Sequence, residues 1–118
     1  MISLPDILFF TNVAILAVAH ELDAIHQREW RFFFGFTPLS DETAYRLFTA
    51  LHVPLLVIIL WNLHSFWFQI GFDLFMIIHA GLHWGLRNHP AIHFDNWFSW
   101  VWICGGAMLG VVHLLLLF

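Results

Sequence analysis

The chain has no lysine, one cysteine and few charges: of 118 residues, 4 are basic and 8 are acidic. Without a lysine amine, it cannot carry a Schiff-base cofactor such as retinal. The lone Cys104 excludes an intrachain disulfide and a multi-thiolate zinc or iron–sulfur site. The net charge of −4 with so few basic residues argues against a nucleic-acid partner and a polybasic lipid-binding patch.

Hydrophobic residues make up 61% of the chain and charged residues only 10%, whereas soluble domains carry about 25% charged residues. This composition predicts an integral membrane protein with one domain covering residues 1–118. Each hydrophobic stretch reaches the roughly 20 residues that a bilayer crossing requires. The connections are short, which predicts an all-α, up-down four-helix bundle. The expected spans are about 4–31, 41–62, 65–86 and 96–118.

The basic residues indicate the orientation of these spans. All four arginines, Arg28, Arg31, Arg46 and Arg87, fall at the same end of the expected bundle. By the positive-inside rule that end is cytoplasmic. We therefore expect a multi-pass protein of the bacterial inner membrane with both termini on the outer side.

Three histidines, His20, His52 and His79, lie in three different hydrophobic stretches. A rise of 1.5 Å per helical residue puts all three in the cytoplasmic half of the membrane. An ionisable side chain in a bilayer is costly and therefore indicates a function. His64 and His113 belong near the outer face and are not assigned to this site.

Spacing adds a fourth histidine, because His79 and His83 are four residues apart and share one helix face, as two metal ligands on one helix require. Carboxylates on the polar helix faces supply groups that bind metals or move protons. The predicted metal ligands are His20, His52, His79 and His83, and the predicted catalytic carboxylates are Glu21, Asp23 and Asp73. Glu21 or Asp23 would be a ligand or a general base, and Asp73, near the midplane, would handle protons or would only join helices.

A purely structural interpretation also exists, in which hydrogen-bonded histidines join the helices. The number of polar groups favours a site, because joining two helices requires only one polar pair. Gly106 and Gly110 form a small-residue face that predicts a close helix contact or an oligomer seam.

Imidazoles combined with carboxylates suit Zn²⁺ or non-haem iron. The sequence therefore predicts a metal-dependent membrane enzyme that hydrolyses or oxidises a membrane-soluble substrate. One alternative is a haem- or pigment-binding accessory subunit, and another is a proton or metal-ion pathway that uses Asp73. The expected partners are membrane lipid and a lipid-soluble small molecule, within a homo-oligomer or a larger membrane complex.

Several short motifs together resemble a family of small four-span bacterial membrane proteins of unknown function. The most distinctive is the stretch H-E-x-D-A-x-x-x-x-E-W-R, which covers residues 20–31. The others are H-V-P-L at 52–55, H-A-G-L-H at 79–83 and H-P at 89–90. This resemblance implies the four-span topology and no particular reaction.

Overall fold

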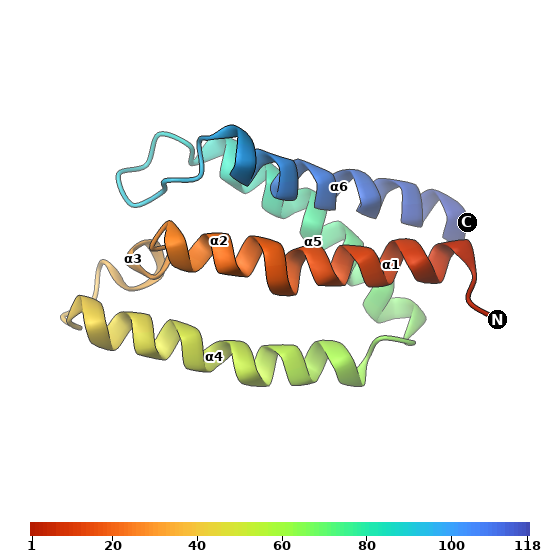
Figure 1. The fold of residues 1–118 in the computed structure, drawn as a ribbon, viewed down its shortest axis with the longest axis horizontal. Helices are drawn as coiled ribbons and strands as arrows, with labels where there is room; N and C mark the ends of the chain where they lie inside the picture. Colours follow the sequence, from red (N-terminus) through yellow and green to blue (C-terminus); the bar gives the residue numbers. More distant parts are fainter.

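A computed structural model describes residues 1–118, and all of its regular structure is helical. The first long helix, Leu4–His26, consists of α1 (Leu4–Ala14), the π-helical segment η1 (Ile15–His20) and α2 (Glu21–His26). The remaining helices are α3 (Trp30–Phe34), α4 (Asp41–Trp61), α5 (Phe66–Gly85) and α6 (Trp97–Leu117). The four long helices run alternately in opposite directions, with both termini at one end and α3 at the other (Figure 1). The predicted all-α class is confirmed.

Polar side chains at the first residue before each long helix determine where it begins. Ser3 and Asp6 form a reciprocal capping box at the start of α1. The hydroxyls of Ser40 and Ser65 and the amide oxygen of Asn96 accept backbone N–H groups at the starts of α4, α5 and α6. Each cap satisfies an N–H group that has no partner within the helix.

The predicted continuation of the first helix to Arg31 is wrong, because α2 ends at His26. Arg28 has φ 59°, in the left-handed region. The N–H of Arg28 donates to the carbonyl of Ile25 at 3.2 Å, and that of Glu29 donates to Ala24 at 3.0 Å. This pair of bonds is a Schellman motif, which terminates a helix and reverses the chain. The reversal brings Glu29 back towards the bundle.

Replacing Arg28 by glycine should raise the free energy of unfolding by roughly 0.5–1 kcal/mol, because glycine adopts a positive φ without a Cβ clash. Denaturant unfolding in detergent would measure the change. Arg46→Gly is the matched control, since Arg46 is an exposed residue inside α4 and glycine there should cost about 1 kcal/mol. Equal destabilisation by both substitutions would contradict the proposed role of the left-handed turn.

Buried polar side chains and exposed apolar ones occur together in this structure. Polar residues such as Asn12, His20 and Asp73 are buried, whereas large apolar residues such as Met108 and Leu115 are exposed. Three helices, Leu4–His26, Asp41–Trp61 and Trp97–Leu117, are long and apolar enough to cross a membrane. These features are typical of a membrane protein.

The expected fourth span corresponds to α5, which has 20 residues. It is not among the three sufficiently apolar helices. Its sequence includes Gln69, Asp73, His79 and His83, which lower its hydropathy. Membrane insertion of α5 therefore remains a prediction.

Glycines bring α6 close to its neighbours. A Cβ added at Gly110 would lie 3.1 Å from the backbone oxygen of Asp73, and one at Gly106 would clash with the Met76 side chain. The predicted small-residue contact is therefore made within the chain, between α6 and α5. In contrast, α4 faces η1, α2 and α5 across a cavity of about 810 Å³.

Candidate metal centre

Four buried or partly buried side chains converge near the α3 end of the bundle. They are His20 at the end of η1, Glu29 in the turn before α3, and His79 and His83 on α5. One potential ligand atom from each residue lies within 4.8 Å of the corresponding atoms of the other three. Three imidazoles and one carboxylate form a donor set that suits a divalent transition metal.

Each of these residues is positioned by a local backbone feature. Single turns of π-helix change the direction of the side chains that follow, and they are frequent at functional sites. Here η1 ends at His20, which is only 2% exposed. The helical spacing of His79 and His83 puts both rings on one face of α5.

The turn at Arg28 places Glu29, and the next two residues anchor it. The Trp30 indole N–H donates to Asp41 Oδ1 at 2.8 Å, and the Arg31 guanidinium bonds both oxygens of Asp41. These contacts attach α3 to the start of α4. Glu29 itself is 8% exposed.

The three imidazole rings are arranged edge to face. Their centroids lie 4.6 Å apart for His20 and His79, 5.3 Å for His20 and His83, and 4.5 Å for His79 and His83. The Nε2 atoms of His79 and His83 are 3.1 Å apart. Two nitrogens on a tetrahedral zinc ion would be about 3.3 Å apart, given bonds of about 2.0–2.1 Å. The two nitrogens therefore have the separation of neighbouring metal ligands.

The three histidines of this group make fewer hydrogen bonds than buried polar side chains normally make. His79 and His83 contact each other through Nε2, but the Nδ1 atoms of His20, His79 and His83 are buried without a partner. Buried polar groups in proteins are normally hydrogen-bonded. A network that only joined helices would satisfy more of these atoms.

Glu29 is the acidic member of the group. Burial is the main factor that raises the pKa of its carboxyl to about 8, and repulsion from Glu21 and Asp23 adds to the shift. A bound cation would act in the opposite direction and stabilise the ionised carboxylate.

His52 lies outside this group and pairs with Glu21. Its Nδ1 is 2.6 Å from the carbonyl oxygen of Phe48, and its Nε2 contacts Glu21 Oε2. A carbonyl can only accept, so Nδ1 must carry a proton. Another proton must then lie between Nε2 and the carboxylate, on one or the other. The pair therefore holds a proton between α2 and α4.

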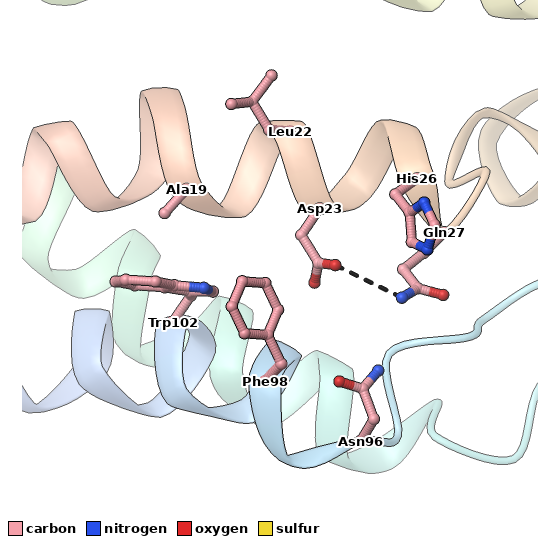
Figure 2. Close-up of a pocket in the computed structure, with 8 residues that line it drawn as sticks. All are labelled: Ala19, Leu22, Asp23, His26, Gln27, Asn96, Phe98 and Trp102. Atoms are coloured by element: carbon pink, nitrogen blue, oxygen red, sulfur yellow. Dashed lines mark hydrogen bonds between the residues drawn. The ribbon is translucent and has the colours of Figure 1, made fainter.

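Asp23 joins α2 to α6. Its Oδ2 accepts a hydrogen bond from Ser99 Oγ at 2.5 Å, and its Oδ1 accepts one from Gln27 at 3.4 Å. Figure 2 shows Asp23 and Gln27 facing Asn96, Phe98 and Trp102 across an open pocket between the two helices. These bonds occupy the carboxylate, which is not one of the four converging groups.

Asp73 is paired with a histidine that the sequence analysis did not assign. Asp73 Oδ2 lies 2.6 Å from Nδ1 of His113, and both side chains are buried. The Phe9 ring stacks on the His113 ring with centroids 5.3 Å apart. His113 is not one of the four converging groups, but it is buried against Asp73 because α6 packs on α5.

Of the predicted ligands, His20, His79 and His83 come together, while His52 is beside them in contact with Glu21. Sequence reasoning missed Glu29 as a member of this group, although it begins the E-W-R motif of the distinctive stretch. The missing information was the helix end at Arg28.

Comparison with known proteins places the chain in a family without adding a reaction. No curated protein and no solved structure matches it. The model of a family of unknown function, DUF6713, matches residues 5–118, nearly the whole length. The chain therefore belongs to the DUF6713 family of unknown function.

Proposed function

We propose that the protein is an integral membrane metalloenzyme that binds one divalent ion through His20, Glu29, His79 and His83. The convergence of these four ligand atoms within 4.8 Å carries the proposal. The 3.1 Å separation of the Nε2 atoms of His79 and His83 supports it.

We further propose that four helices, including α5, cross the bacterial inner membrane. The polar residues of α5 point away from lipid, because Asp73 and His83 are buried by the other helices. All four arginines belong to the end that carries α3, which supports a cytoplasmic location for that end. The metal site then lies in the cytoplasmic half, and both termini lie outside.

The residues around the ion support catalysis more than simple storage. His20, Glu29 and His79 border the cavity between α4 and α5, and so does the Glu21–His52 pair. A divalent ion in this position would polarise a carbonyl or activate water. Glu21 and His52 would supply or accept the proton of such a step, in the manner of a general acid–base pair.

The geometry favours a bare ion over haem. Four protein ligand atoms converge on one point, whereas a haem iron takes at most two axial ligands from the protein. Zinc and non-haem iron both accept histidine and carboxylate ligands. Zinc would be colourless and redox-inactive and would favour hydrolysis, whereas iron would favour oxidation.

Elemental analysis of the purified protein tests this function. We expect about one zinc or iron per chain after purification in detergent, without the Soret absorption band of haem. Replacing both His79 and His83 by alanine should abolish this content, whereas His64→Ala, on the loop between α4 and α5, should preserve it. Wild-type protein that remains metal-free after incubation with zinc or with ferrous iron would refute the proposal.

A further inference from the structure

The cavity between α4 and α5 is long and polar in only one region. Of its 19 lining residues, 13 are hydrophobic. Along α5 it extends from Trp67 to Leu82, which corresponds to a rise of about 22 Å. Its volume of about 810 Å³ is within the range of small-molecule sites.

The polar lining residues are grouped in the half of the cavity nearer α3. They are three of the four proposed metal ligands, together with the Glu21–His52 pair. The other half is lined by apolar side chains, among them Ile59, Trp67 and Phe72. A ligand that matches this lining has a small polar head and a long apolar chain.

Charge indicates the kind of head group. Three neutral imidazoles and the Glu29 carboxylate leave a divalent ion with a net charge of about +1. His83 does not line the cavity, whereas His20, Glu29 and His79 do. An additional ligand would therefore reach the ion from the cavity, and an anionic oxygen donor would neutralise its charge. The proton held between Glu21 and His52 is available to a second oxygen of that head group.

The side of the cavity formed by α4 provides a path from the surrounding bilayer for a ligand with an apolar chain. Only 17% of the most apolar stretch of α4 is buried, compared with 39% in the first helix. A molecule dissolved in the bilayer could pass beside α4 without crossing water. This route suits a ligand that partitions into lipid.

We propose that this cavity binds a long-chain carboxylic acid, with its carboxylate at the metal ion and its chain between α4 and α5. This inference rests on the proposed metal site and adds the substrate class. It commits to a single-chain acid, because the polar region is small and the remainder of the cavity is apolar.

Gly71 provides a selective way to block the chain region. It lines the cavity, and a Cβ added there would meet no atom within 4 Å, so a larger side chain would extend into open space. Gly81 on the same helix is equally unobstructed but does not line the cavity. Gly71→Phe and Gly81→Phe are therefore a test variant and a matched control.

The experiment uses the full chain in lipid nanodiscs with a photoreactive analogue of palmitic acid. The concentration of palmitic acid that displaces half of the label should be at least tenfold lower than that of hexadecan-1-ol, which lacks the carboxylate. Gly71→Phe should reduce displaceable labelling at least tenfold, while Gly81→Phe should label like the wild type. Metal content is measured in the same samples, and we expect both variants to retain the ion.

The outcomes separate this inference from the function on which it rests. Metal-loaded wild type without displaceable labelling would overturn the inference and leave the metalloprotein intact. Equal displacement by palmitic acid and hexadecan-1-ol, or full labelling of Gly71→Phe, would also overturn it. Wild type that binds no metal would refute the proposed function, and the inference would fail with it.

Discussion

Replacing His83 by alanine should remove nearly all bound metal from the purified protein. His83 supplies one of the four converging ligands, so its loss should lower the affinity by more than the roughly 10–100-fold typical of groups that only support a ligand. His20→Ala and His79→Ala should have similar effects. Elemental analysis of detergent-purified variants, at equal protein concentration, measures the result.

Glu29→Gln is the most informative companion variant, because it preserves the shape of the side chain and removes its charge. We expect it to lose most of the bound ion while remaining folded and monodisperse. His52→Ala should retain the ion, since the His52 ring faces Glu21 and Phe48. If His52→Ala emptied the site as completely as His83→Ala, the proposed ligand set would be wrong.

A second large effect is expected at the buried pair on α5 and α6. His113→Ala should lower the free energy of unfolding by about 3–5 kcal/mol, because it leaves the Asp73 carboxylate buried without its partner. Thermal or denaturant unfolding in detergent would report the loss. The metal content should be unchanged, since Asp73 is six residues, or about 9 Å along α5, from His79.

A double-mutant cycle separates the pair from the individual side chains. Asp73→Asn combined with His113→Ala should be less unstable than His113→Ala alone, because no carboxylate then remains buried. Additive effects of the two changes would show that Asp73 and His113 do not interact. Loss of activity in Asp73→Asn without loss of stability or metal would instead support the predicted proton-handling role.

Several features were accessible from composition and periodicity. The helical class follows from long apolar stretches separated by polar caps, and Ser40 marks a helix start through its own side chain. Spacing alone puts His79 and His83 on one face of α5. Residues 20, 52 and 79 were expected at similar depth because helical rise is regular.

The proposed ligand set depends on features that periodicity does not contain. The π-helical segment η1 alters the direction of His20, and a left-handed residue at Arg28 reverses the chain. If the first helix had continued past His26, Glu29 would lie further along its axis, away from the three histidines. Instead, it approaches His79 and His83, which lie 50 and 54 residues further along the sequence.

The sequence by itself determined which groups had to be sheltered, because charged and imidazole side chains in an apolar chain cannot face lipid without a large cost. Tertiary structure decided which groups meet. Close approach at Gly110 brings α6 against Asp73 and thereby pairs Asp73 with His113. The cavity beside α4 keeps His52 apart from the three histidines, and His52 contacts Glu21 instead. The turn at Arg28 brings Glu29 to the three histidines. Such pairings depend on the packing distances and rotations of whole helices, which residue spacing along one helix does not specify.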